Sequence, residues 1–328
     1  MPEEKLDLTK FDSIFIYSLN YIGDTLFTTP VFRAVKELNP NIKLIAVVGK
    51  KGGYQILKDN PYVDTIIEIE KGVFNSIKQI KSGLGKDSIP KISIILENDF
   101  KSALICFLLG INYRIGINSE FRGFLLTHRT VTNSTHIVDK YFDNLQFFSD
   151  DIKCKGIEFF INNEEIANSS LTLPDKQTIK IAISPSTTNL NKKYSDDNYI
   201  KFINELLSSN NNIEIYLIGG NDSNASAEYI TNKINNKRLH NFVCKTGSLN
   251  ELAYLLNQMN FVIGSDTGPL HIANALRVPT LYLFSVSSPL KTGPYNKKNS
   301  KVILPPDNSK NINSISPYTI SNYILKNL

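Results

Sequence analysis

The amino-acid sequence predicts an α/β fold of two doubly wound domains in series, and three observations carry that prediction. Short runs rich in β-branched and aromatic residues alternate with stretches of helical periodicity. The alternation stops in the polar segment 161–177, rich in Asn, Glu and Ser, and then restarts. The length of 328 residues is enough for about two domains of ordinary size. We therefore expect an N-terminal domain over residues 1–165 and a C-terminal domain over residues 166–328.

The first half opens with a strand, loop and helix unit. A β-rich run covers residues 13–17, a loop covers 18–23, and a helical pattern covers 24–38. The same pattern predicts further strands at 42–48, 65–69 and 92–96 and helices near 53–59 and 101–109. Alternation of this length indicates a parallel sheet covered by helices on both faces.

The second half repeats this organisation. Strands are predicted at 180–184, 213–218, 242–244, 261–263 and 280–284, and helices near 196–208, 225–234, 249–258 and 269–276. The last helical pattern covers residues 317–328. It can pack on the second domain or cross back to pack on the first, and the sequence does not decide between the two.

Composition and charge exclude several classes of protein. Hydrophobic residues make up 41% of the chain, but no stretch approaches the ~20 uninterrupted apolar residues of a membrane-spanning helix. The charged N-terminus lacks the apolar core of a signal peptide, so we expect a soluble, cytoplasmic protein. The three cysteines are odd in number and widely separated, which fits neither a disulfide framework nor the close pairs of a zinc site. A net charge of +5 does not indicate a nucleic-acid binder but suits an anionic substrate or membrane surface.

The segment 264–276 is the most informative part of the chain. It follows the apolar run 261–263, and it predicts a strand that ends in a tight turn and a helix that starts at 267–269. The backbone N–H groups and the dipole of such a helix start attract phosphate. Asp266 and Thr267 can accept bonds from the first helical N–H groups, and His271 can point back to the same opening. The alternative is an ordinary helix cap and a core histidine.

A carboxylate occupies the corresponding position in the first half. Residues 18–30 contain a single glycine and match neither a dinucleotide fingerprint nor a P-loop. Asp24 is expected at the start of the helix, where capping is its simplest role. If the two domains face each other across a cleft, Asp24 lies opposite the Asp266 turn and can take a proton from a hydroxyl group.

Three further loops of the second half offer polar contacts. The hydroxyl-rich loop 184–195 contains Lys192 and Lys193 and is suited to hold a diphosphate leaving group, or it is a solvated surface loop. The turns 218–223 and 246–249 either line a nucleoside pocket or are ordinary α/β connections.

Taken together, these motifs resemble those of glycosyltransferase family 9, the ADP-heptose:lipopolysaccharide heptosyltransferases. The resemblance covers nearly the whole chain and is most specific in its C-terminal motif. The matching segments are Gly23-Asp24 with Pro30, the Ser/Thr loop that ends at Lys192, Asp266 to Ala273 with Pro279, Ile115-Gly116, and His136 to Val138.

Family membership implies a GT-B architecture, in which two Rossmann-like domains face each other across a cleft. It also implies inversion at the anomeric carbon, an ADP-sugar as co-substrate, no metal or other cofactor, and an acceptor in the lipopolysaccharide inner core. Asp24 falls on the family's catalytic base and Lys192 on the lysine that contacts the donor phosphates. The expected donor-binding residues are Thr187, Thr188, Lys192, Asp222, Gly247, Asp266, Thr267, Gly268, Pro269 and His271.

The chain departs from the family at two places. Lys193-Tyr194 stands where the family usually has a tryptophan, and this chain has no Trp. Residues 284–289 replace a common Gly-Pro-Thr element. The identity of the transferred sugar is therefore left open by the resemblance.

Acceptor recognition is expected in the first domain. The stretch 113–129 mixes aromatic, apolar and basic residues, and we expect Arg114, Arg122 and Arg129 to bind the acidic glycolipid acceptor, with weak contact to the cytoplasmic face of the inner membrane. The alternative is a solvated loop. For the whole chain, a heptosyltransferase is expected, and a nucleotide-sugar epimerase of the same fold or a non-catalytic nucleotide-sugar binder is the alternative.

Overall fold

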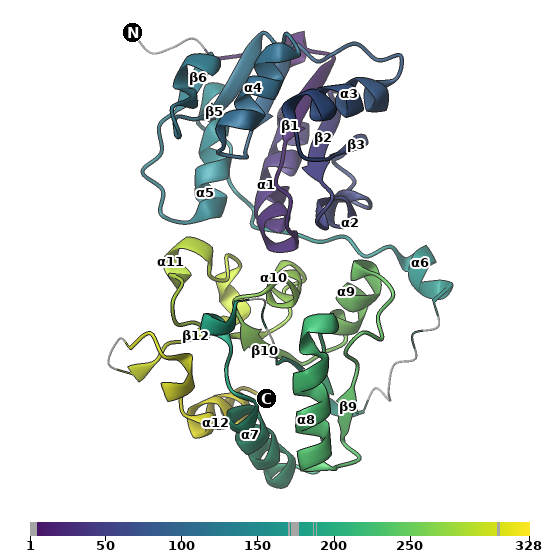
Figure 1. The fold of residues 1–328 in the computed structure, drawn as a ribbon, viewed down its shortest axis with the longest axis vertical. Coiled ribbons are helices and arrows are strands. Elements are labelled where there is room, and N and C mark those ends of the chain that lie inside the picture. Colours follow the sequence, from purple (N-terminus) through teal and green to yellow (C-terminus); the bar gives the residue numbers. More distant parts are fainter. Residues whose placement is uncertain (1–4, 170, 172–176, 186, 188, 307–308) are drawn as a thin grey trace. The chain divides into compact units, whose positions relative to one another are not determined.

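The chain folds into two compact units that divide after Phe160 (Figure 1). A computed structural model describes residues 5–169, 171, 177–185, 187, 189–306 and 309–328. The sequence-based boundary lies after residue 165, inside helix α6 (Asn163–Ala167), which belongs to the second unit. Among these described residues, no helix is both long enough and apolar enough to cross a membrane.

The first domain is built on a sheet in which six parallel strands follow the order β3-β2-β1-β4-β5-β6. The strands are β1 (Ser13–Tyr17), β2 (Lys43–Gly49), β3 (Thr65–Ile69), β4 (Ile92–Ile95), β5 (Tyr113–Ile117) and β6 (His128–Thr130). The central strands are apolar along almost their whole length because both of their faces are covered. Strands β5 and β6 escaped sequence reasoning, because the stretch that forms them was interpreted as an acceptor-binding loop.

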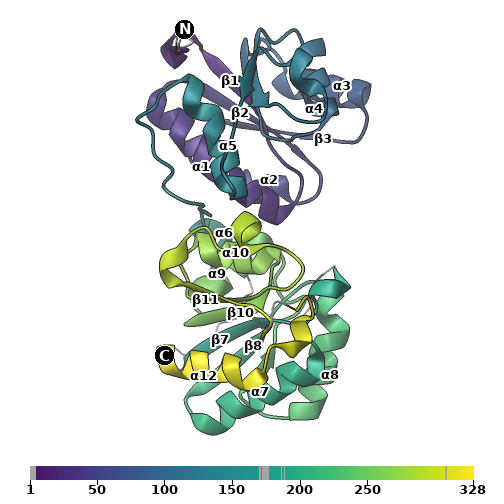
Figure 2. The ribbon, with the colours of Figure 1, turned by 90° about the vertical axis from the view of Figure 1, so that its left-hand side faces the viewer.

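Helices cover both faces of this sheet. They are α1 (Ile22–Leu38), α2 (Gly53–Leu57), α3 (Val73–Leu84), α4 (Phe100–Leu108) and α5 (Ile137–Phe142). Helix α1 packs against α5 and α3 packs against α4, on opposite faces of the sheet (Figure 2). Helix α3 was not predicted, although Ile80 and Leu84 on its buried face lie four positions apart, the spacing of an amphipathic helix.

The second domain repeats the same strand order. Its six parallel strands follow β9-β8-β7-β10-β11-β12, which is again third, second, first, fourth, fifth and sixth in chain order. The strands are β7 (Ile179–Ser184), β8 (Ile213–Leu217), β9 (Leu239–Asn241), β10 (Phe261–Ser265), β11 (Thr280–Leu283) and β12 (Ser300–Ile303). The predicted strand at 242–244 is therefore displaced from β9, and β12 was not predicted.

The last helix, α12, lies on the second domain. Besides α6, the helices here are α7 (Asp196–Ser209), α8 (Asn224–Ile234), α9 (Leu249–Asn257), α10 (Gly268–Ala275), α11 (Pro289–Thr292) and α12 (Pro317–Asn327). Helix α12 lies beside α7 (Figure 2). Ile320 and Ile324 of α12 are buried in the core of this domain, and Ser321 Oγ donates to Glu205 Oε2 of α7 at 2.5 Å. The suggested crossing of residues 317–328 to the first domain is thus wrong, because the apolar face of α12 is buried beside α7.

Both sheets reverse their strand order beside their first strand. The loops after β1 and β4 therefore meet at the carboxyl edge of the first sheet, and the loops after β7 and β10 meet at that of the second. In open α/β sheets, ligands bind at such reversal points. Three of these four strand ends carry predicted site residues: Asp24 follows β1, Lys192 follows β7 and Asp266 follows β10.

Candidate active site

Asp266 is the centre of a polar cluster at the end of β10. Its Oδ2 accepts a hydrogen bond from Lys192 Nζ at 2.7 Å, and its Oδ1 lies 3.0 Å from His271 Nε2. Ser287 Oγ also donates to Oδ2, at 3.1 Å. The Asp266 side chain is 8% exposed, and burial alone raises its pKa. The hydrogen bonds and charges of His271 and Lys192 outweigh burial and lower the pKa of Asp266 to about 2.

The helix that follows Asp266 is not capped as the sequence suggested. Thr267 is the N-cap of α10, and its hydroxyl donates to the Ser265 carbonyl at 3.2 Å instead of capping the helix. Gly268 and Pro269 form its first turn. The prediction that Asp266 caps this helix is wrong, because its two oxygens are held by the side chains of Lys192, from the loop after β7, and of His271, in the helix itself.

His271 points back toward the start of α10, as predicted. It is buried and its Nε2 faces Asp266, while its Nδ1 lies 3.5 Å from the Tyr282 hydroxyl of the neighbouring strand β11. The same hydroxyl donates to the Leu270 carbonyl at 2.7 Å. These contacts hold the imidazole between Asp266 and Tyr282.

Lys192 reaches this cluster from the loop after β7. It ends the short helix η4 (Leu190–Lys192), and its carbonyl accepts a hydrogen bond from Ser265 Oγ at 2.6 Å. An ammonium group has three donor hydrogens, so one bond to Asp266 leaves the group able to bind an anion as well. Because a carboxylate repels phosphate, Asp266 suits the positioning of Lys192 better than direct contact with a diphosphate.

The other predicted donor-binding residues lie along the same edge of the sheet. Thr187 is buried in the loop that carries Lys192, and its Oγ1 accepts from Asn189 N at 3.3 Å. Asp222 is exposed in η5 (Asn221–Ser223) after β8. Gly247 follows β9, and its N–H donates to Glu251 Oε2 at 2.7 Å. Thr188 lies outside the described residues.

Tyr194, which replaces the usual tryptophan, belongs to the core and not to a ligand pocket. It is fully buried, its hydroxyl donates to the Ile315 carbonyl at 2.7 Å, and its ring meets Tyr199 edge-on at 5.2 Å. Lys193 pairs with Asp196 at 3.3 Å. Lys192 is thus the lysine of this loop that joins the Asp266 cluster.

In the first domain, Asp24 lies in the first turn of α1 and is half-buried. The helix begins at Ile22 with Tyr21 as its N-cap, so Asp24 is not the cap that the simplest interpretation made it. Its charge acts on two neighbouring groups, Glu97 after β4 and Tyr141 of α5.

Glu97 is a site residue that sequence reasoning missed. Burial, together with the charges of Asp99 and Asp24, raises the pKa of Glu97 to about 7, against the opposing charges of Arg122 and Lys101. Its Oε2 accepts from Asn20 Nδ2 at 3.1 Å, which joins the loop after β4 to the loop after β1. The available signal was an acidic residue directly after a buried strand.

The three predicted acceptor arginines have different environments. Arg122 is completely buried, and it donates to the carbonyls of Glu97 and Ile117 and to Asn98 Oδ1. The prediction that it binds the acceptor is therefore wrong: its guanidinium holds the loop after β4. Arg114 is half-buried and donates to the carbonyls of Ile111 and Leu125. Arg129 is exposed, and its Nε donates to the Gly123 carbonyl at 2.9 Å.

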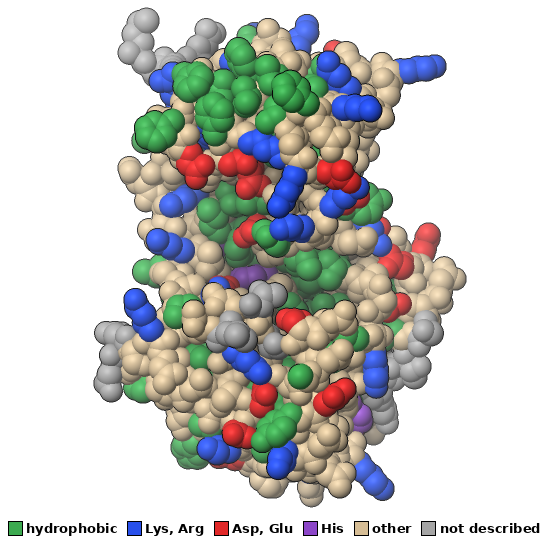
Figure 3. Space-filling view, in the orientation of Figure 1, with side chains coloured by type: hydrophobic (Ala, Val, Ile, Leu, Met, Phe, Trp, Pro, Cys, Tyr) green, Lys and Arg blue, Asp and Glu red, His purple; other side chains and the backbone are tan. Residues whose placement is uncertain are grey.

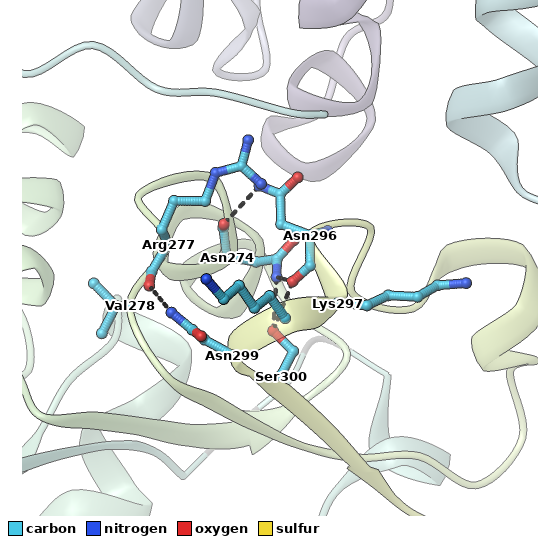
Figure 4. Close-up of a pocket in the computed structure, with 8 residues that line it drawn as sticks. Asn274, Arg277, Val278, Asn296, Lys297, Asn299 and Ser300 are labelled. Carbon is cyan, nitrogen blue, oxygen red and sulfur yellow. Dashed lines mark hydrogen bonds between the residues drawn. The ribbon is translucent and has the colours of Figure 1, made fainter. Parts of the chain in front are cut away.

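A separate cavity of about 370 Å³ lies in the second domain (Figure 4). Its lining includes Arg277, Lys297 and Ser300, which come just before strands β11 and β12 or at their start. The Asn274 and Asn296 side chains beside it bond to each other's backbones. The cavity is thus at the amino edge of the sheet, away from Asp266. Among the described residues, no group of three or more His, Cys, Asp or Glu is arranged to hold a metal ion.

Comparisons with known proteins agree with this architecture. The model of glycosyltransferase family 9 (heptosyltransferase) matches residues 90–319. The lipopolysaccharide core heptosyltransferase OpsX of Haemophilus influenzae is 23% identical over 313 residues, which are 91% of this chain and 86% of that protein. A family 9 glycosyl transferase from Veillonella parvula superposes with a TM-score of 0.84 at 18% identity over 98% of both chains. The Escherichia coli heptosyltransferase WaaC with ADP gives a TM-score of 0.78 at 19% identity, over 96% of this chain and 100% of that one.

Proposed function

This chain belongs to glycosyltransferase family 9 and has the GT-B fold of its two Rossmann-like domains, and on that premise we propose that it is a heptosyltransferase of the lipopolysaccharide inner core. It would transfer heptose, or a related sugar, from an ADP-linked donor to a core hydroxyl at the cytoplasmic face of the inner membrane. The names of its relatives support the substrate class, and WaaC with bound ADP supports the nucleotide. The observation that carries the proposal is the Lys192, Asp266 and His271 cluster at the end of β10.

The donor diphosphate is assigned to this cluster. Lys192 stabilises the negative charge that develops on the leaving ADP; Asp266 holds Lys192 in place, and His271 holds Asp266. The start of α10 adds the backbone N–H groups of Thr267 and Gly268 and a positive dipole end, and Pro269, which has no N–H, sits in its first turn. Thr187, Thr188, Asp222 and Gly247 are assigned to the rest of the donor.

Asp24 is assigned as the base. The acceptor oxygen forms a bond to the anomeric carbon as the bond from that carbon to the diphosphate oxygen breaks, which inverts the configuration. The acceptor proton passes to the Asp24 carboxylate, and the electron pair of the broken bond leaves with ADP. Arg114 and Arg129 are assigned to the anionic acceptor. Because Lys192 and the helix start supply positive charge, we expect transfer to continue in the presence of a chelator.

The deciding experiment incubates the purified protein with ADP-heptose and a heptose-deficient core glycolipid, and follows ADP release and product mass. Transfer by the wild type, with its loss in D24A and K192A while both variants stay folded, is the expected result. Conversion of the donor without acceptor would indicate an epimerase. Donor binding without transfer to any core acceptor would indicate a binding protein. Normal turnover by D24A would refute the assigned base.

A further inference from the structure

One surface of the first domain exposes large apolar side chains at high density. We call it the aromatic face; its exposed members are Phe100, Phe107, Leu108, Phe121, Phe124 and Val131. They come from a single stretch of the chain that forms α4, β5, the short helix η2 (Arg122–Leu125) and β6. Figure 3 shows hydrophobic side chains gathered over the part of this domain where Figure 1 draws α4. Exposed apolar patches of this kind mark interaction surfaces.

Side-chain contacts join several members of the aromatic face to one another and to arginines. Helix α4 packs against η2, and the rings of Phe100 and Phe124 lie 6.0 Å apart. The Arg114 guanidinium lies 5.3 Å from the centre of the Phe107 ring. Arg129 donates to the Gly123 carbonyl, directly beside Phe124. Apolar rings and arginine side chains are therefore interleaved on one surface.

Phe121 is held out from the domain by its own backbone. It is 95% exposed, and it and Glu120 have positive φ angles of 57° and 48°. Two consecutive non-glycine residues in the left-handed region cost conformational free energy, which the surrounding structure must offset. The next residue, Arg122, supplies that support, because it is completely buried and bonded to the loop after β4. The turn thus presents a phenyl ring that adds nothing to the core.

The charges of the stretch 100–131 favour an anionic partner. Between residues 100 and 131 the cations outside the core are Lys101, Arg114 and Arg129, and the only acidic residue in that stretch of sequence is Glu120. Aromatic side chains on a projecting turn, with cations beside them, match the apolar and anionic layers of a lipid surface. We infer that the aromatic face docks onto an anionic phospholipid bilayer, with Phe121 and Phe124 entering the headgroup region.

The inferred docking depends only on the surface of the first domain, so it should occur without a bound donor and without sugar transfer. Its consequence for the reaction rests on the proposed function: a domain held at the bilayer meets a lipid-linked acceptor in two dimensions.

The test is flotation of the full-length protein with vesicles made from equal parts of phosphatidylcholine and phosphatidylglycerol. We expect the wild type to float, and the F121S/F124S variant to bind about tenfold more weakly or worse. The matched control is F74S, since Phe74 is 83% exposed on α3, outside the aromatic face. This control should float like the wild type, and thermal unfolding should confirm that all three proteins are folded.

Three results would overturn the inference. They are wild-type protein that does not float, a double variant that floats like F74S, and a wild-type dimer in solution that F121S/F124S converts to monomer. The last result would assign the face to a second copy of the chain. Binding is measured without donor, so aromatic-dependent flotation by a protein that transfers no sugar would refute the proposed function alone.

Discussion

Lys192 Nζ lies 2.7 Å from Asp266 Oδ2, although 74 positions separate the two residues in the sequence. The contact exists because β7 and β10 are neighbours in the second sheet, so that the segments following them meet at its carboxyl edge. The carboxylate is buried and ionised at neutral pH, and the lysine remains partly accessible. Asp266 therefore fixes the position of the cation that we assign to the donor diphosphate.

The first prediction concerns this coupling. K192A should lower kcat/KM by about 10²–10³-fold, the usual effect of removing a preorganised group that stabilises transition-state charge. D266N should cause a similar loss, and K192A/D266N should be little worse than K192A, because Asp266 acts through Lys192. Steady-state kinetics with ADP release measures all three.

The matched control is K193A, since Lys193 pairs with Asp196 and not with the cluster. It should keep nearly full activity. Additive losses in the double variant, or an unimpaired D266N, would show that Asp266 does not act through Lys192.

The second prediction is a pH dependence from Glu97. Its pKa is raised from 4.5 to about 7 in the folded protein, so the fold binds this proton more tightly than the unfolded chain. The stability from the protonated carboxyl is fully present below about pH 4.5 and is lost as pH rises through about 7. The free energy of unfolding of E97Q, relative to that of the wild type, should therefore increase between about pH 5 and about pH 8. The increase should be on the order of 1 kcal/mol at this partly exposed site.

Urea unfolding at each pH measures this difference. E120Q is the control, since Glu120 is an exposed acid of the same domain. If the free energies of unfolding of E97Q and the wild type differed by the same amount at every pH, the raised pKa of Glu97 would be contradicted.

The third prediction separates the structural arginine from the exposed one. R122M should destabilise the protein by about 3 kcal/mol or more, because the carbonyls and amide that Arg122 bonds would be left buried without their donor. R129A should change stability by less than about 0.5 kcal/mol, as expected for an exposed residue, and should raise the KM for an anionic acceptor.

Chemical denaturation and acceptor kinetics test the two arginines together. Equal stability losses would refute the assignment of Arg122 as structural, and an unchanged acceptor KM in R129A would remove Arg129 from the acceptor site.

The fourth prediction concerns the packing that holds Asn20 beside Glu97. A Cβ added at Gly49 would lie 1.8 Å from Asn20 Oδ1, so G49A must displace that side chain. We expect G49A to cost about 1–3 kcal/mol of stability. In N20A/G49A the clash is gone, so the double variant should be more stable than the sum of the two single losses implies.

G220A provides the comparison, since a Cβ at Gly220 would lie 3.4 Å from its nearest neighbour, Asp222 Oδ1. The urea midpoint of G220A should be close to that of the wild type. Additivity of N20A and G49A would show that the clash with Asn20 is not the cause of the loss.

The sequence by itself determined the two parallel α/β halves and the strand-to-helix turn that carries Asp266 and His271. Both are local properties: strands buried on two faces are continuously apolar, and a helix start shows itself within a few residues. The same reasoning missed β5, β6 and β12 and displaced β9, because short or edge strands have weak periodicity. It also missed α3, although the apolar spacing of that helix was present in the sequence.

Only the tertiary structure decided how the polar groups are paired. It made Asp266 the partner of Lys192 instead of a helix cap, buried Arg122 under the loop after β4, and placed Glu97 in the field of Asp24. It also placed α12 against α7 in the second domain. Each of these contacts joins residues far apart in the chain, and their meeting depends on strand order, which no local pattern of residues encodes.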